Sequence, residues 1–138
     1  MVPVDKMAFL QHVSLFAGMT AHELVQVTAL LQETRYPPET TVIREQDAGD
    51  CMFIVADGEV TVHRGDVEIR RLRSKDFFGE MSLLDREPRS ASVTTISNCL
   101  LLRLDQRDFW RLLIEHNTLG ISMVKVLTQR LRQVTARL

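Results

Sequence analysis

The residues most suited to chemistry lie in the segment Asp76–Val93, which reads DFFGEMSLLDREPRSASV. Gly79 permits a sharp turn and a close approach of the backbone to another group. A short helix that begins near Glu80 would present free backbone N–H groups to an anion. Arg89 follows later in the segment, held by Pro88 and succeeded by small residues. The segment therefore predicts an anion site made of one guanidinium group and several backbone amides.

The ligand that suits this segment best is a cyclic phosphodiester, which carries one negative charge, one ribose 2′-hydroxyl and one base. The planar fork of Arg89 can donate to both exocyclic phosphate oxygens. Backbone amides near Ser82, Ser90 and Ala91 can add neutral donors. The carboxylate of Glu80 can accept the 2′-hydroxyl proton and so select ribose over deoxyribose. Because the charge to be neutralised is single, no magnesium ion or other cofactor is required.

Each of these residues also has an interpretation that involves no ligand. Glu80 could simply stabilise a helix N-terminus, by about 0.3–1 kcal/mol. Arg89 could form a surface ion pair with Glu87 or Asp85, worth roughly 0–1 kcal/mol. Ser90 could be a small strand residue. Their combination in one segment favours the anion site.

The first element expected to position this segment is helical. Apolar residues recur at helical spacing from Asp5 to Gln32, with a break at Gly18. Thr20 and Glu23 form a capping-box signature for the helix after this break. We expect Pro37-Pro38 to end the helical region, because proline lacks an amide hydrogen and restricts its predecessor.

A strand-rich region follows from Thr40 to Leu104, where the apolar period changes to two. The runs TTVIRE, CMFIVA, EVTVH, VEIRRL, SASVTTIS and CLLLRL are short, and turn signals such as the hairpin Arg64–Asp66 separate them. The helical period returns after Asp105, and Asn117 is expected to cap the last helix. Many short strands with frequent turns predict a sandwich, jelly roll or closed barrel.

The segment FGEMSLLDREPRSASV resembles the phosphate-binding cassette of the cyclic nucleotide-binding domain family. That family includes the catabolite activator protein, regulatory subunits of cAMP-dependent protein kinase and cyclic nucleotide-gated channels. FLQHVSLFAGMTAHEL is similar to the family's N-terminal helical segment, and GDCMFIVADGEVTVH is similar to its strands, so the resemblance covers nearly the whole chain. The residues that match the cassette pattern are Phe78, Gly79, Glu80, Met81, Ser82, Leu83, Arg89, Ser90, Ala91 and Val93.

The resemblance implies an α+β fold: an antiparallel eight-stranded β-roll, jelly-roll-like, flanked by N-terminal helices and C-terminal helices. It implies one cyclic nucleotide-binding domain over residues 1–138. The helical pattern from about residue 117 runs to Leu138 without a stop signal, which suggests that the C-terminal helix is truncated within or just after this point. Glu39, Gln46 and Lys75 stand where the family often has glycine, which questions the local geometry of three turns.

The implied function is that of a regulatory sensor without catalytic activity, whose C-terminal helix reports ligand occupancy. The ligand contacts it implies are Gly79, Glu80, Met81, Ser82, Arg89, Ser90 and Ala91. The three-four apolar spacing of the last helix leaves three roles open: to cover the roll, to form a dimer seam, or to cap the base, with Arg130 or Leu127 stacking on it. In the family, a threonine directly after the cassette arginine often accompanies selectivity for cyclic GMP. Because this chain has Ser90 there, we expect a modest preference for cyclic AMP.

Two alternatives stay open. The chain could be a structural interaction module of the same fold that has lost ligand binding. The macromolecular partner of the chain is also open. It could be a second copy of the chain, bound through the C-terminal helix, or a missing effector domain. An enzyme is disfavoured, because the sequence lacks a nucleophile–base arrangement or a metal cluster.

Composition indicates what kind of protein this is and which partners it does not attract. The 138 residues are 45% hydrophobic and 25% charged, with a net charge of -1, so we expect a globular domain with no bulk attraction to nucleic acid. No run approaches the ~18 apolar residues that indicate a membrane span. Cys51 and Cys99 could pair or stay free, and their apolar surroundings favour buried thiols in a reduced compartment. Cytoplasmic location follows as the default expectation.

Overall fold

The computed structural model describes residues 3–136 as two compact units. One unit spans Leu31–Phe109 and contains all the strands. The other unit is helical and combines residues 3–30 with residues 110–136.

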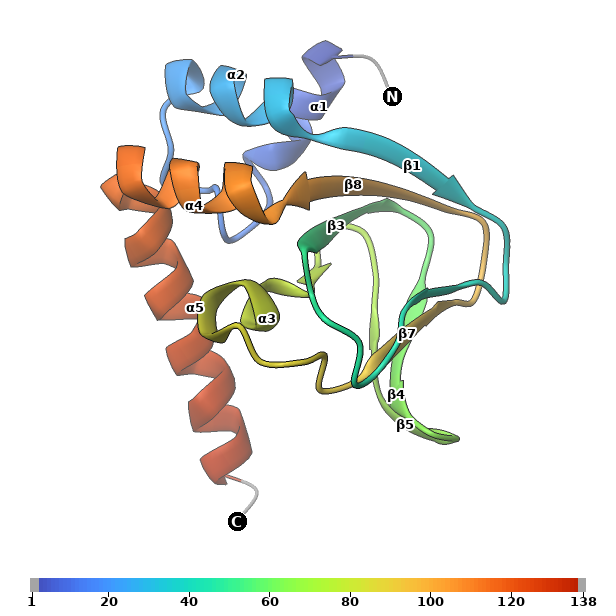
Figure 1. The fold of residues 1–138 in the computed structure, drawn as a ribbon. Helices are drawn as coiled ribbons and strands as arrows, with labels where there is room; N and C mark the ends of the chain where they lie inside the picture. The colour runs from blue at the N-terminus through green and yellow to red at the C-terminus, as the bar shows by residue number, and fades with distance from the viewer. Residues whose placement is uncertain (1–2, 137–138) are drawn as a thin grey trace. The chain divides into compact units, whose positions relative to one another are not determined.

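The unit spanning Leu31–Phe109 is a β-roll of two four-stranded antiparallel sheets (Figure 1). The first sheet has the order β1 (Gln32–Tyr36), β8 (Cys99–Asp105), β3 (Cys51–Asp57) and β6 (Phe77–Phe78). The second has the order β2 (Thr41–Ile43), β7 (Ser92–Thr95), β4 (Val60–Arg64) and β5 (Val67–Leu72). The expected eight-stranded antiparallel roll is therefore confirmed.

The core of the roll is apolar and draws on both sheets. On β4, Val60 and Val62 are buried while Thr61 between them is partly exposed, as the period of two predicts. The rings of Phe53 on β3 and Phe78 on β6 stack with their centroids 5.3 Å apart. The cluster as a whole consists of Cys51, Phe53, Val55, Val60, Val62, Leu72, Phe78, Val93, Cys99 and Leu101.

Two strands do not follow from the sequence pattern. β1 reads QETRY and has no buried residue, yet it pairs with β8 over five positions, from Gln32↔Arg103 to Tyr36↔Cys99. β6 has only two residues. The prediction that the helical region reaches Gln32 and ends at Pro37-Pro38 is wrong, because pairing with β8 holds residues 32–36 as a strand.

The helical unit contains α1 (Pro3–Leu10), α2 (Ala21–Leu30), α5 (Asn117–Ala136) and the C-terminal part of α4 (Gln106–Glu115). The capping box before α2 is confirmed. The N–H of Thr20 donates to Glu23 Oε1 at 2.9 Å, and the N–H of Glu23 donates to Thr20 Oγ1 at 3.2 Å. The first helix ends at Leu10, earlier than the predicted break at Gly18, and turns follow it.

His116 lies between α4 and α5 and contacts α2 through both ring nitrogens. Nδ1 lies 2.9 Å from Glu23 Oε2, and Nε2 lies 2.9 Å from Gln26 Oε1. The pKa of Glu23 is held below its ordinary value, chiefly because its carboxylate accepts the backbone N–H of Thr20, with a smaller contribution from His116. Glu23 thus joins the start of α2 to the junction of α4 and α5.

Three turns adopt left-handed backbone at residues other than glycine. The φ angles are 60° at Glu39, 73° at Gln46 and 83° at Lys75, and all three side chains are exposed. The N–H of each donates to a backbone carbonyl at 2.8 or 2.9 Å. These are the three positions where the family often has glycine. Left-handed backbone costs a residue with a side chain about 1–2 kcal/mol, which glycine avoids.

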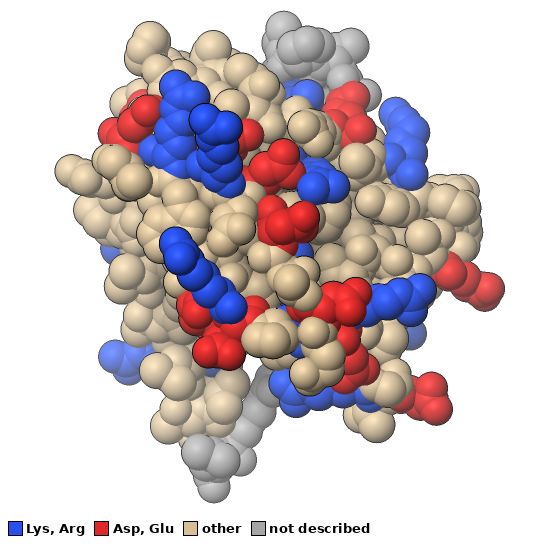
Figure 2. All heavy atoms as spheres, viewed as in Figure 1, with Lys and Arg blue, Asp and Glu red and all other residues tan. Residues whose placement is uncertain are grey.

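The structure also bears on the expectations about cysteines, membrane spans, metal sites and surface charge. Cys51 and Cys99 are both buried and free. Between residues 3 and 136, no helix has the length and apolar content of a membrane span, and no group of three or more His, Cys, Asp or Glu side chains could hold a metal ion. On the face in Figure 2, acidic and basic side chains are interspersed.

Candidate functional site

The predicted anion segment connects β6 to β7 and contains α3 (Glu80–Asp85), so the short helix expected near Glu80 is confirmed (Figure 1). A left-handed residue stands on each side of α3. Gly79 precedes it with a φ of 91°, and Arg86 follows it with a φ of 60°. The N–H of Arg86 donates to the carbonyl oxygen of Ser82 at 3.0 Å, which closes the last turn.

One cavity of the roll brings together the predicted contact residues of this segment. Its walls include Gly79, Glu80, Met81, Ser82, Arg89, Ser90 and Ala91. The empty space amounts to about 450 Å³, part of it open to solvent. Arg130 is not among the lining residues and lies on α5.

The other walls of the cavity come from strands that sequence reasoning did not connect to the site. They are Ile43 on β2, Val62 on β4, Arg70 on β5, Phe78 on β6 and Val93 on β7. Phe78 and Val93 match the cassette pattern but were not expected to contact a ligand. For Ile43, Val62 and Arg70, no signal was available, because the pairing of distant strands places them here.

Arg89 is buried, with 4% of its surface exposed. Its Nη1 donates to the carbonyl oxygen of Gly79 at 2.7 Å, and its Nη2 donates to the carbonyl oxygen of Cys51 at 2.6 Å. The alternative of a surface ion pair with Glu87 or Asp85 is therefore wrong. Asp85 instead accepts the backbone N–H of Glu87 at 2.9 Å.

Two glycines make room for the Arg89 side chain. A Cβ atom on Gly49 would lie 2.5 Å from Ser82 Cβ and 2.9 Å from Arg89 Cζ. A Cβ atom on Gly79 would lie 2.9 Å from Arg89 Nη1, and the φ of 91° also favours glycine there. The site residues expected from the sequence include Gly79 but not Gly49, although Gly49 begins the segment GDCMFIVADGEVTVH that resembles the family's strands.

The remaining predicted residues differ in burial. Glu80 and Ser82 are buried, with 2% and 5% of their surfaces exposed. Met81 and Ser90 are exposed, and Ala91 is half-buried. Of these, Glu80 therefore places a second functional group, a carboxylate, in the wall away from bulk solvent.

Two backbone hydrogen bonds and one bond to a serine side chain hold the Arg89 segment against the loop after β2. The N–H of Gln46 donates to the carbonyl oxygen of Arg89, and the N–H of Arg89 donates to that of Asp47, both at 2.8 Å. The N–H of Glu45 donates to Ser92 Oγ at 2.9 Å. These bonds fix the backbone position from which the Arg89 side chain enters the roll.

Cys51 lies beside the guanidinium group, with its Sγ 3.9 Å from Arg89 Nη2. Burial raises the pKa of this thiol above its ordinary value. The thiol is therefore protonated at neutral pH, which leaves Arg89 without an anionic partner at this contact.

Comparison with known proteins is consistent with this geometry. The family model for the cyclic nucleotide-binding domain matches residues 33–116. A cAMP-dependent protein kinase regulatory subunit from Aspergillus fumigatus is 36% identical over 108 residues, which is 77% of this chain and 26% of that protein. A cGMP-dependent protein kinase from Toxoplasma gondii is 40% identical over 86 residues, which is 62% of this chain and 9% of that protein.

Among solved structures, the catabolite activator protein of Thermus thermophilus has a TM-score of 0.83 and 27% sequence identity, and the match covers 90% of this chain and 61% of that one. The chain thus spans only a part of the relatives that it matches.

Proposed function

Because the chain belongs to the cyclic nucleotide-binding domain family, we propose that its roll binds a cyclic nucleoside monophosphate and that it serves as a non-catalytic regulatory sensor. The observation that carries the proposal is the environment of Arg89. This guanidinium is buried, and the contacts described above are to two carbonyl oxygens and a protonated thiol, which carry no negative charge. A buried charge without a counter-charge is costly, and a ligand phosphate would supply one.

The donors of Arg89 match such a ligand. A guanidinium group has five N–H donors. The contacts to Gly79, to the Cys51 carbonyl and to the Cys51 thiol use three of them at most. The remaining N–H donors leave the guanidinium able to bond a ligand phosphate, and the buried carboxylate of Glu80 suits the ribose 2′-hydroxyl.

A modest preference for cyclic AMP is part of the proposal. Ser90 lacks the threonine methyl that restricts χ1, so its hydroxyl can bond the phosphate and leave the guanine amino group without a dedicated partner. An unpaired buried donor costs roughly 1–3 kcal/mol, and water in the gap would reduce the preference to about tenfold at most. We expect Ser90→Thr to shift the affinity ratio towards cyclic GMP.

Cyclic GMP is the alternative ligand, and Arg70 is the observation that favours it. This residue lines the same cavity from β5, and arginine donates well to O6 and N7 of guanine. Calorimetric titration of the chain with both nucleotides, at one salt concentration, decides between them. Arg70→Ala should then lower the affinity for cyclic GMP more than that for cyclic AMP if Arg70 reads the base.

The output of the sensor is proposed to pass through α5. Its exposed apolar side chains are Ile121, Val124, Leu131 and Val134, which a second copy or an effector domain could cover. Ligand can change the state of α5 only through different affinities for two states. A contact of Arg130 or Leu127 with the base, and one domain over residues 1–138, belong to the same proposal.

The experiment that tests the proposal is direct binding. We expect the purified chain to bind cyclic AMP or cyclic GMP in a calorimetric titration and to leave the nucleotide unhydrolysed after incubation. Absence of binding to both would favour the alternative of an interaction module that has lost its ligand. Sedimentation with and without nucleotide would detect a ligand-dependent dimer.

A further inference from the structure

We propose that the turn between β4 and β5 positions the ligand site and that Arg64 is its positioning residue. This inference rests on the proposed function, because it concerns the same cavity. Arg64, Gly65 and Asp66 form the hairpin turn that the sequence predicted, and Arg64 pairs with Val67 across it.

The turn is held from both sides at Gly65. The N–H of Gly65 donates to Glu45 Oε1 at 2.8 Å, and the carbonyl oxygen of Gly65 lies 2.8 Å from His63 Nδ1. His63 Nε2 in turn lies 2.8 Å from Thr94 Oγ1. The carbonyl oxygen of Gly65 can only accept, so Nδ1 donates to it. The turn is thereby connected to the loop after β2, through Glu45, and to β7, through Thr94.

From this anchored turn, Arg64 reaches the candidate site. Its Nε donates to the carbonyl oxygen of Ser90 at 2.9 Å. Ser90 and Ala91 line the cavity, whereas Arg64 does not. In the proposed arrangement, Arg64 therefore holds the Ser90 carbonyl away from the ligand space.

The orientation of this one peptide group decides what an anion meets. In a trans peptide, the carbonyl oxygen and the following N–H point in opposite directions. Holding the Ser90 oxygen on the outside therefore turns the N–H of Ala91 towards the cavity. If the peptide flipped, a carbonyl dipole would face the phosphate in place of a donor. Arg64 acts through this peptide and not by touching the ligand.

The neighbouring peptide is held by a different part of the chain. There, the N–H of Gln46 donates to the carbonyl oxygen of Arg89 at 2.8 Å. Two consecutive peptides of the candidate site thus depend on two separate loops. The loop after β2 holds one, and the turn between β4 and β5 holds the other.

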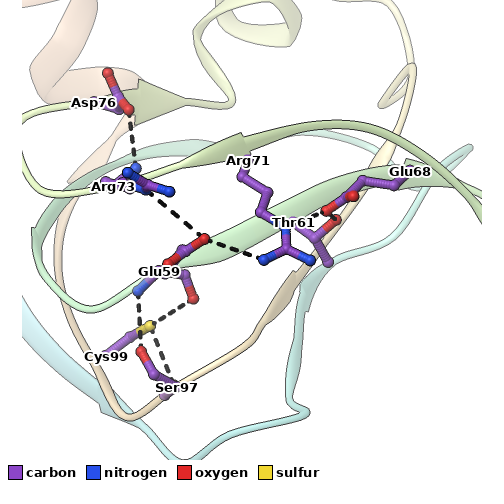
Figure 3. Close-up of polar contacts among 8 residues, drawn as sticks. All are labelled: Glu59, Thr61, Glu68, Arg71, Arg73, Asp76, Ser97 and Cys99. Atoms are coloured by element: carbon purple, nitrogen blue, oxygen red, sulfur yellow. Dashed lines mark hydrogen bonds and ion pairs between the residues drawn. The ribbon is translucent and has the colours of Figure 1, made fainter.

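The test compares Arg64→Ala with Arg64→Gln and with a matched control on the same hairpin. Arg71 is the control because its hydrogen bonds go to other side chains of the sheet: its Nε donates to Glu68 Oε1 at 2.8 Å and its Nη1 to Glu59 Oε1 at 3.5 Å (Figure 3). We expect Arg64→Ala to weaken cyclic AMP binding by about five- to tenfold, as measured by calorimetry. Arg71→Ala should leave the affinity unchanged.

Arg64→Gln separates positioning from charge. Glutamine removes the positive charge but keeps an N–H donor for the Ser90 carbonyl. It should therefore retain more affinity than alanine. If the Gln and Ala variants lose equal affinity, a hydrogen-bond donor at this position does not explain the effect and the inference is overturned.

A second readout uses the two phosphorothioate isomers of cyclic AMP, in which sulfur replaces one exocyclic oxygen or the other. Loss of one directed N–H should change the affinity ratio of the isomers in Arg64→Ala but not in Arg71→Ala. Normal affinity and an unchanged ratio in a folded Arg64→Ala protein would overturn the inference and leave the proposed function intact. If the unmodified chain binds neither nucleotide, the proposed function fails, and the inference fails with it.

Discussion

Arg89 Nη1 lies 2.7 Å from the carbonyl oxygen of Gly79, the residue that opens α3. The side chain proposed to bind phosphate therefore also fastens the start of the helix that forms one wall of the cavity. Ligand binding and local stability share one residue. Replacing Arg89 is therefore expected to affect stability as well as binding.

Arg89→Ala should lose at least about tenfold in cyclic nucleotide affinity and also lower the free energy of unfolding of the ligand-free chain by about 1–3 kcal/mol. The reason is that the buried carbonyl of Cys51 and that of Gly79 both lose a donor. Denaturant unfolding and calorimetry measure the two effects. Arg89→Lys, which keeps the charge, is the control. Its affinity and its free energy of unfolding should lie between those of Arg89→Ala and those of the original chain. Unchanged affinity in a folded Arg89→Ala protein would remove Arg89 from the site.

Gly49→Ala should destabilise the chain by about 1–3 kcal/mol and weaken nucleotide binding, because the new methyl group overlaps Ser82 and Arg89. Gly120→Ala on α5 is the control. Its Cβ would lie 4.0 Å from Leu113 Cδ2, an ordinary contact, so alanine should stabilise the helix by up to about 1 kcal/mol. Equal effects of the two substitutions on unfolding would contradict the packing of Gly49 against Arg89.

Glu39→Gly and Lys75→Gly should each raise the free energy of unfolding by about 0.5–1 kcal/mol. Glycine relieves the strain of left-handed backbone, and the greater freedom of the unfolded chain offsets part of that gain. Asp66→Gly, at an exposed turn position without a positive φ, should be destabilising instead. Thermal unfolding of the three variants checks the prediction, which is wrong if all three change stability in the same direction.

Glu80→Gln should weaken cyclic AMP binding less than Arg89→Ala does and should reduce the discrimination against 2′-deoxy cyclic AMP. The amide keeps the shape of the buried carboxylate and can still accept a hydrogen bond, but without the charge. Titration of both ligands measures the ratio, with the exposed Glu87→Gln as control. A full preference for ribose in Glu80→Gln would show that another group reads the 2′-hydroxyl.

Glu23→Gln should make unfolding less dependent on pH in the acid range. The folded-state pKa of Glu23 lies below its ordinary value of 4.5, chiefly because of the Thr20 N–H. A lowered pKa contributes stability above the unfolded-state pKa, and this contribution is lost as the pH falls through the folded-state value. Urea unfolding from pH 6 to pH 3, in steps of about one unit, compares the variant with the original chain. If the free energy of unfolding depends on pH equally in the two proteins below pH 4.5, Glu23 does not have this role.

The sequence by itself was sufficient for features that depend on neighbouring residues. Gly79, Glu80, Ser82, Arg89, Ser90 and Ala91 stand in one segment, so their types and order could be recognised before any strand was paired. The α3 helix, the capping box at Thr20 and the hairpin at Gly65 also depend on short-range geometry, and all three were predicted. Alternating apolar runs predicted six of the eight strands for the same reason.

Only the tertiary structure decided what depends on residues distant along the chain. β1 has a polar sequence, and backbone pairing with β8 makes it a strand, a long-range interaction that propensity does not report. Gly49 and Arg89 meet because the chain folds back between them, and Arg70 and Val62 reach the cavity only through their places in the second sheet. Likewise, Arg64 contacts Ser90 across 26 positions of sequence. Hydrogen bonds between strands and close packing set these contacts, and neither follows from the local order of residues.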